Sequence, residues 1–406
     1  MAGSELLAPL KERDFARLWA GQMVSNAGDW VNYVALTAMV WNLTGSAWMV
    51  ALLRACHAIP LLLLGPFSGV FVDRWNRKIT LIVVDILRAG LVLLFPLVHD
   101  VATIMAITLT FNIVATFFSP AKNALIPHIV TRERLLAANS LSSTTQNMAM
   151  VIGPALGGII LAAGGTPAAF YFDSATFVFS AISIASMAVS GASWRESDRA
   201  GSAWKELSDG LQFASSRRPV RTALLLEMGM MLGWGSINVL AVVIAEKLLG
   251  GGTTEYGLLL TAVGLGSLAG ALVTGSQGDR LGLQRFFPLG FLLTGLAIAG
   301  LAGSRVLLAA SIGYFFAGVG RMAVEVAATT IYQKAVPDGL RGRIFSLRHM
   351  VTHLVVLVAN QLAGFFTDAA SIAPILIAAA VVQLAFAGLS VLLWGHGGRD
   401  IAKEVD

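Results

Sequence analysis

Charged and amide side chains stand inside long apolar runs, where they can do chemistry that lipid-facing residues cannot. The first run carries Asn26, Asp29 and Trp30, which share one helical face because they are three and four residues apart. An ionisable group at bilayer depth costs several kcal/mol unless it is paired or hydrated, so it marks a functional position. A carboxylate there can exchange a proton or bind a cation. We therefore expect Asp29 to be a functional cavity group, the alternative being a packing partner of a nearby arginine.

The next three runs each carry charged or amide side chains as well. Asp85 and Arg88 are three residues apart, and we expect them to neutralise each other as a structural pair. We expect Arg54 either to pair with Asp29 or to face a cavity. The fourth run has Asn112 near its middle.

The second half of the chain has its own candidates. Glu227 lies early in one apolar run, and Arg321 and Glu325 lie four residues apart in a later one. Such a mixed pair can bind a polar substrate or pass on a proton, and the alternative is a self-satisfied gating ion pair. His349 and His353 have metal-ligand spacing, but no third ligand is near them in sequence, so we expect no metal site. Weaker candidates are Asp173, Asn360 and Gln361.

Patterns that carry catalysis or nucleotide binding are missing from the sequence. There is no G-x-x-x-x-G-K-[ST] loop, so ATP-driven pumping is unsupported. No Ser-His-Asp set, H-E-x-x-H motif or Cys/His cluster indicates an enzyme. The single cysteine, Cys56, excludes an intramolecular disulfide and argues against a thiolate metal site. We expect no enzyme activity and no cofactor.

The elements that must position these residues are membrane helices. Of 406 residues, 56% are hydrophobic and 13% are charged, whereas a soluble domain carries about a quarter charged residues. Apolar runs of about 20 residues fit spanning helices, and the short alternating segments of a β-barrel do not appear. The first 16 residues lack the apolar core of a signal peptide, so we expect the first helix to direct insertion. The net charge of +5 follows membrane orientation, and we expect no nucleic-acid partner.

Twelve apolar runs predict twelve spanning helices. The expected spans are 16–41, 47–73, 78–98, 101–125, 139–163, 168–190, 221–247, 255–277, 285–303, 306–333, 345–368 and 371–394. Most of the 28 Lys and Arg residues fall in the connections on the side that holds both termini. The positive-inside rule therefore predicts that both termini are cytoplasmic.

The longest polar connection divides the chain into six plus six spans. It predicts an N-terminal half at 1–190, a cytoplasmic linker at 191–220 and a C-terminal half at 221–406. Trp204, Leu207 and Leu211 fall on one helical stripe, which favours an interfacial helix in the linker over a solvated coil.

A dense charge cluster follows the second apolar run and must lie in a short aqueous loop. Its residues are Gly69, Asp73, Arg74, Arg77 and Lys78. The charge of Asp73 suits the N-terminus of a facing helix, and we expect Asn76 to turn the chain in a left-handed backbone conformation.

The sequence also repeats itself. Gly275-Ser-Gln-Gly-Asp279-Arg280-Leu-Gly282 matches this charge cluster 206 residues later, and Pro127 and Pro337 lie in similar segments 210 residues apart. Two matches at nearly one offset indicate duplication of two halves with parallel orientation.

The fifth span contains Gly153-Pro154-Ala-Leu-Gly157-Gly158. Proline inside a spanning helix bends it, and the glycines leave a groove for a neighbouring helix. The alternative to a functional motif is a helix that is kinked for packing alone.

Together these motifs resemble those of the major facilitator superfamily. The charge cluster is similar to that family's G-x-x-x-D-R-x-G-R-K loop, with Asn76 in place of a glycine. The fifth span is similar to the G-x-x-x-G-P-x-x-G-G signature of its exporters, with Ala149 in place of the first glycine. The resemblance implies two pseudo-symmetric six-helix halves, a conformational switch at Asp73 and at Asp279–Arg280, and a cavity lined by spans one, four, seven and ten. The arginine that exporters often carry in helix four is missing.

One branch of the superfamily is closer still. Arg17-Leu-Trp19-Ala-Gly21-Gln22, Asn26-Ala-Gly28-Asp29, Leu43-Thr-Gly45-Ser46 and Ala138-Asn139-Ser140 resemble the bacterial exporters that include the enterobactin exporter and macrolide efflux pumps. The resemblance implies a monomeric secondary transporter of the bacterial cytoplasmic membrane that exports a small amphipathic compound by proton antiport. The alternatives are a lysophospholipid flippase and, from another class, a membrane sensor or scaffold without transport.

Overall fold

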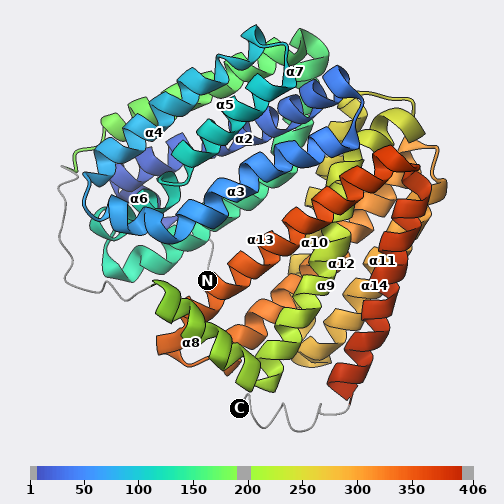
Figure 1. The fold of residues 1–406 in the computed structure, drawn as a ribbon. Helices are drawn as coiled ribbons and strands as arrows, with labels where there is room; N and C mark the ends of the chain where they lie inside the picture. Colours follow the sequence, from blue (N-terminus) through green and yellow to red (C-terminus); the bar gives the residue numbers. More distant parts are fainter. Residues whose placement is uncertain (1–6, 190–202, 396–406) are drawn as a thin grey trace. The chain divides into compact units, whose positions relative to one another are not determined.

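A computed structural model describes residues 7–189 and 203–395, and every regular element within them is a helix. Packing divides the chain into two compact units (Figure 1). The first unit comprises Met1–Gly45 and Leu52–Asp198, and the second comprises Ser46–Ala51 and Arg199–Asp406. Numbers 191–202 of the predicted linker lie outside the described residues.

The helices of the first unit are packed around α2 and α7, which lie side by side (Figure 1). Their bounds are α2 Arg13–Thr44, α3 Ala47–Val72, α4 Arg77–Val92, α5 Val101–Ala115, α6 Phe118–Leu125 and α7 Leu135–Ala185. The core of this unit joins α2 to α4 and α6 through Phe15, Leu81 and Leu125, each no more than 1% exposed.

The second unit begins with a short helix and continues with longer ones. Their bounds are α8 Ala203–Ser216, α9 Arg218–Val243, α10 Thr253–Leu281, α11 Phe286–Gly303, α12 Leu307–Ala335, α13 Asp338–Ala369 and α14 Ile372–Gly395. Leu226, Phe287 and Tyr332, all fully buried, hold α9, α11 and α12 together.

Two helices are interrupted where the sequence requires it. Gly165 in α7 has φ 71°, so α7 is two helices joined at a kink, with Pro167 in the first turn of the second. The predicted span 101–125 is broken between α5 and α6 because Pro120 has no backbone N–H to bond to the preceding turn.

Capping residues set two helix starts and one helix end in the first unit. Gly45 ends α2 with φ 59°, and Asp100 begins α5 by accepting a 2.8 Å hydrogen bond from the Thr103 N–H. That bond holds the pKa of Asp100 below its usual value. Asn76 begins α4 by accepting a 3.1 Å bond from the Ile79 N–H, with φ −71°. The prediction of a left-handed Asn76 is wrong, because its side chain acts as a helix cap.

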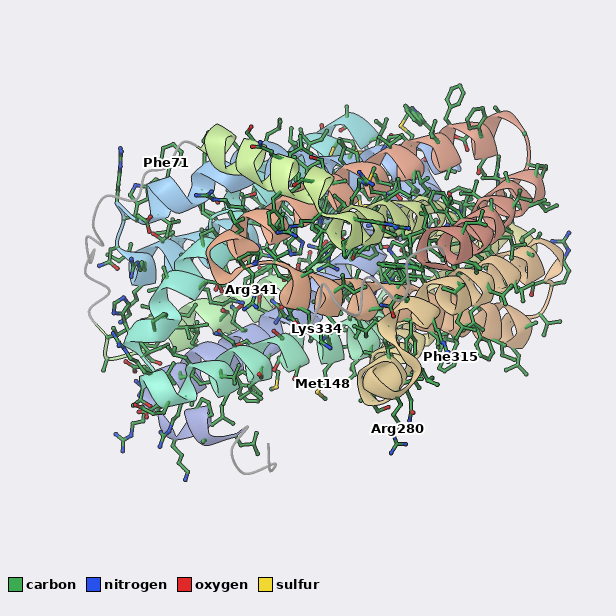
Figure 2. The ribbon with its side chains drawn as sticks, turned by 90° about the horizontal axis from the view of Figure 1, so that it is seen from below. Phe71, Met148, Arg280, Phe315, Lys334 and Arg341 are labelled. Carbon is green, nitrogen blue, oxygen red and sulfur yellow. The ribbon has the colours of Figure 1, made fainter. Side chains whose placement is uncertain are left out.

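The predicted fold class is confirmed. Among the described residues, ten helices are long and apolar enough to cross a membrane, and α7 counts once among them although it contains two spans. With the more polar α2, which is 32 residues long, these provide the twelve expected spans. The protein is an all-α, multi-pass membrane protein. Many apolar side chains are exposed on the helices, as Phe71 is in Figure 2.

Candidate functional site

Asp29 is the centre of a polar cluster in the first unit. It lies near the middle of α2, and Nη2 of Arg88 on α4 donates a hydrogen bond to its Oδ1. The Asp29 side chain is 37% exposed, whereas that of Arg88 is 9% exposed. The carboxylate of Asp29 is therefore accessible, whereas the guanidinium of Arg88 is buried.

Arg88 is held between two aromatic rings. Its Cζ lies 4.0 Å from the ring centre of Phe177 on α7 and 4.7 Å from that of Phe111 on α5. A guanidinium over a ring face gains on the order of 1 kcal/mol from the ring quadrupole. The rings keep the positive charge stable inside the helix bundle without binding it to one carboxylate.

Two further carboxylates, Asp85 on α4 and Asp173 on α7, are fully buried in the same cluster. Asn32 of α2 donates a 2.7 Å hydrogen bond to Asp173, and both carboxylates interact electrostatically with Asp29 and Arg88. Within residues 7–189 and 203–395, neither oxygen of Asp85 has a hydrogen-bond partner. The expected pair Asp85–Arg88 is not formed, because the guanidinium of Arg88 binds Asp29 on α2 instead.

The exporter-like motif packs against α2 beside Asp29. A Cβ on Gly153 would collide with Trp30, and one on Gly157 would lie 3.3 Å from Cα of Val31. Pro154 and Gly158 are buried as well. The motif therefore lets α7 approach the turn of α2 that carries the candidate carboxylate.

Arg54 and Asn112 lie apart from the Asp29–Arg88 pair. Arg54 donates a 2.5 Å hydrogen bond to Thr37 Oγ1, and its Cζ lies 3.5 Å from the ring centre of Tyr33. Asn112 donates to the carbonyl of Thr108 in its own helix, at 2.8 Å. The structure therefore gives Asp29 an arginine partner, but from the third predicted span and not from the second.

Asn26 lines a small pocket in the first unit. The pocket is enclosed by α2, α6 and α7, and its polar wall includes Gln22, Lys122 and Thr145. Lys122 on α6 is 8% exposed. The sequence analysis missed this cation because the break between α5 and α6, which turns it inward, was not foreseen.

In the second unit, Glu227 of α9 is the acceptor in a buried network. Arg348 of α13 donates to both carboxylate oxygens at 2.6 to 3.0 Å, and the Tyr332 hydroxyl donates at 2.8 Å. The exposed fractions of the Glu227 and Arg348 side chains are 1% and 10%. Glu227 is thus fully satisfied inside the helix bundle.

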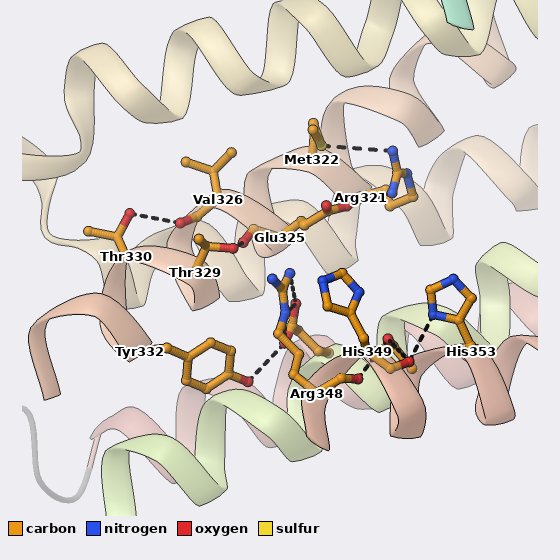
Figure 3. A network of polar contacts seen from close by, with 12 residues as sticks. Arg321, Met322, Glu325, Val326, Thr329, Thr330, Tyr332, Arg348, His349 and His353 are labelled. Atoms are coloured by element: carbon orange, nitrogen blue, oxygen red, sulfur yellow. Dashed lines mark hydrogen bonds and ion pairs between the residues drawn. The ribbon is translucent and has the colours of Figure 1, made fainter. Parts of the chain in front are cut away.

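The expected pair of Arg321 and Glu325 is present on α12, with Nη1 and Oε2 2.6 Å apart. Cζ of Arg321 lies 4.6 Å from the ring centre of Trp234 on α9. Figure 3 shows the Arg321–Glu325 pair on α12 together with Arg348 on α13, and Glu325 and Arg348 also interact electrostatically. His353 is hydrogen-bonded through Nδ1 to the carbonyl of His349, at 2.8 Å.

The predicted switch loop is braced inside the first unit. Buried Arg77 donates to the Ala124 carbonyl at 3.0 Å, and Lys78 donates to the Met187 carbonyl at 2.7 Å. Asp73 is 70% exposed and lies 4.0 Å from Arg77. Arg74 is exposed, and Gly69 is in the last two turns of α3.

The second copy of this loop is at the end of α10. Gly282 ends that helix with φ 82°. Arg280 is exposed and points away from the helices (Figure 2). The side chain of Asp279 lies outside the described part of the chain.

Comparison with known proteins identifies the family to which this chain belongs. The family model for transmembrane secretion effectors, a group within the major facilitator superfamily, matches residues 4–394. The chain belongs to this family.

The chain is similar in sequence to several transporters and similar in fold to solved structures. An uncharacterized MFS-type transporter of Bacillus subtilis, YfiS, is 26% identical over 88% of this chain and 87% of its own length. Macrolide efflux protein A of Streptococcus pyogenes is 25% identical over 87% of this chain and 89% of its own. The inward-facing, unoccupied structure of a bacterial homolog of the human lysosomal transporter Spinster has a TM-score of 0.75 at 12% identity, covering 97% and 98% of the two chains.

The two polar clusters of this transporter differ in charge balance. In the first unit, Asp29, Asp85 and Asp173 surround the single guanidinium of Arg88. In the second, two carboxylates interact with two guanidinium groups. An excess of buried carboxylates can be neutralised only by cations or by protons.

Sequence reasoning missed several residues of these clusters. Arg348 and Tyr332 were not assigned to Glu227, and Asp173 was considered only a weak candidate. The signal that was available is an ionisable group within a spanning helix. It identifies a polar position, but the partner on another helix follows only from the packing.

Proposed function

We propose that the protein is an efflux pump that exports small amphipathic compounds in exchange for protons. The main observation in support is the Asp29–Arg88 pair, in which an accessible carboxylate on α2 forms an ion pair with a buried guanidinium on α4. A pair of this kind can be opened by a competing cation or a proton. The family and the name of the macrolide efflux relative support export of a compound of this class.

Asp29 is the coupling carboxylate in this proposal. When it is ionised, it binds Arg88 or a substrate cation; when a proton neutralises the cluster, the substrate loses its counter-charge and leaves. A protein with two facing states moves toward the one that binds its ligand better. Alternation of the two halves, with substrate and proton bound in turn, then gives exchange.

Transport into proteoliposomes with an imposed pH gradient tests the proposal. The panel includes ethidium, a macrolide, a siderophore and a lysophospholipid, with a proton ionophore as the control that removes the gradient. We expect uphill accumulation of at least one amphipathic drug, lost with the ionophore. Movement of lysophospholipid alone, independent of the gradient, would instead indicate a flippase.

A further inference from the structure

The cluster of Asp29, Asp85 and Asp173 holds more carboxylate than the guanidinium of Arg88 can balance. Asp85 and Asp173 are 0% exposed, and Arg88 is already bonded to Asp29. Two unpaired carboxylates in an apolar helix bundle would cost far more than protonating them. We infer that two of the three carboxylates are neutral when Arg88 is paired with Asp29.

The other helices that pack against α4 supply no further counter-charge. The sequence of α5, Val101–Ala115, has no charged residue, and α6 has only Lys122, which lines the pocket beside Gln22 and Asn26. On α7 the group next to Asp85 is the hydroxyl of Ser180, which interacts with it outside hydrogen-bond geometry. Neutralisation by protons is therefore the remaining solution for this cluster.

Two groups in the cluster have unused hydrogen-bonding capacity. Both oxygens of Asp85 and the Nε–H of Arg88 are buried without a hydrogen-bond partner in the part of the chain that the structure describes. The two residues are three positions apart on one face of α4, within reach of each other. If Arg88 left Asp29 for Asp85, these unsatisfied groups would satisfy one another. Asp173 differs, because Asn32 already bonds it.

We propose that Asp85 carries the exchanged proton, and that Arg88 moves from Asp29 to Asp85 when a lipophilic cation binds to Asp29. In this step the O–H bond of Asp85 breaks and its proton passes to water. The carboxylate left behind accepts hydrogen bonds from Arg88, and the incoming cation takes the place of Arg88 at Asp29. The net charge of the cluster is unchanged. The assignment rests on proton antiport as the function.

The same geometry restricts the substrate that releases the proton. Only a cation can replace a guanidinium as the partner of Asp29, so neutral compounds leave Arg88 in place. Trp30 and Tyr33, whose ring centroids are 5.2 Å apart, follow Asp29 on α2, and the guanidinium of Arg54 covers one face of the Tyr33 ring. A permanent cation with aromatic groups, such as tetraphenylphosphonium, has the charge that this exchange requires and brings no proton of its own.

Binding of tetraphenylphosphonium to the purified full chain in weakly buffered solution tests the exchange. We expect wild type to release protons on binding, and its affinity to rise up to tenfold per pH unit, since one proton is displaced per cation. Asp85→Asn should bind the cation with a pH-independent affinity and release no proton. Asp173→Asn and the exposed loop variant Asp100→Asn should still release protons. Release that persists in Asp85→Asn, or disappears only in Asp173→Asn, overturns the assignment, and so does absence of binding by wild type.

Infrared spectroscopy gives a second readout that needs no ligand. The carbonyl band of protonated carboxyl groups should be weaker in Asp85→Asn than in wild type at neutral pH. It should also be weaker in Asp29→Asn, where Arg88 has lost its first partner and turns to Asp85. An unchanged band in both variants contradicts the proposal. If wild type shows proton release and the band but no gradient-driven transport, the proposed function fails while the proton site stands.

Discussion

Arg348 on α13 and Glu227 on α9 form a buried ion pair in which Nη2 lies 2.6 Å from Oε1. The residues are 121 positions apart in sequence. Together with the Tyr332 hydroxyl they satisfy the carboxylate completely at the cost of removing two charges from water. Such a pair joins α9, α12 and α13 at one point.

Arg348→Met should therefore lower the free energy of unfolding by about 3–5 kcal/mol, because it leaves the Glu227 carboxylate buried and unpaired. Replacing both members, as in Glu227→Leu with Arg348→Met, should cost less than the single change. Thermal unfolding in detergent measures both. Arg280→Met, at an exposed position, is the control and should leave the melting temperature unchanged. A double variant as unstable as the single one would contradict the account.

The fold was predictable from sequence because its signals are local. Apolar runs of spanning length, the charge cluster at Asp73 and the repeat at Asp279 each depend on a few neighbouring residues. The break at Pro120 was not foreseen, because the run that begins at Val101 has the length of one spanning helix. With it, the inward turn of Lys122 was missed.

The site was predictable only as a set of polar positions. Asp29, Glu227 and the Arg321–Glu325 pair were found because ionisable groups inside spanning helices are rare. The partner of Arg88 was not predicted correctly. The three-residue spacing indicated Asp85 as its partner, whereas helix packing brings Asp29 within reach. Contacts between distant helices depend on crossing geometry that sequence spacing does not encode.

Replacing Gly153 of the exporter-like motif, even by alanine, should affect the packing of α7 against α2. A Cβ there would overlap Trp30, so Gly153→Ala should push α7 from α2 and cost about 1–3 kcal/mol, with loss of transport. Gly90 on α4 is the matched control, since a Cβ there meets nothing within 4 Å. Thermal unfolding and drug uptake should separate the two variants. Equal behaviour would show that the close approach is not needed.

The predicted orientation can be checked by cysteine labelling. In a Cys56→Ser background, Ser216→Cys at the end of α8 and His99→Cys before α5 place single thiols on opposite predicted sides of the membrane. A membrane-impermeant reagent applied to whole cells should label position 99 and leave position 216 unlabelled until the membrane is opened. The reverse pattern would invert the topology and exclude cytoplasmic termini.

Asp73→Asn should separate a switch role from a structural role. Asp73 is 70% exposed and 4.0 Å from Arg77, so its loss should change the free energy of unfolding by less than about 1 kcal/mol. If the charge also braces one facing state, its loss should shift the conformational equilibrium about tenfold and alter the transport rate. Melting temperature and drug uptake measure the two effects. Arg74→Gln, also exposed, tests whether any charge change in the loop has the same result.

Asp29→Asn should separate exchange from uphill transport. The variant keeps the shape of the side chain and removes its charge, so Arg88 loses the partner that it has in the structure. Exchange of labelled for unlabelled substrate requires no net proton movement, whereas accumulation against a gradient does. We therefore expect gradient-driven accumulation to be lost and exchange to be less affected. If Asp29→Asn accumulates substrate as wild type does, Glu227 or Glu325 is the coupling carboxylate instead. Glu227→Gln or Glu325→Gln should then lose gradient-driven accumulation. Retention of uphill transport in all three would exclude proton coupling through these carboxylates.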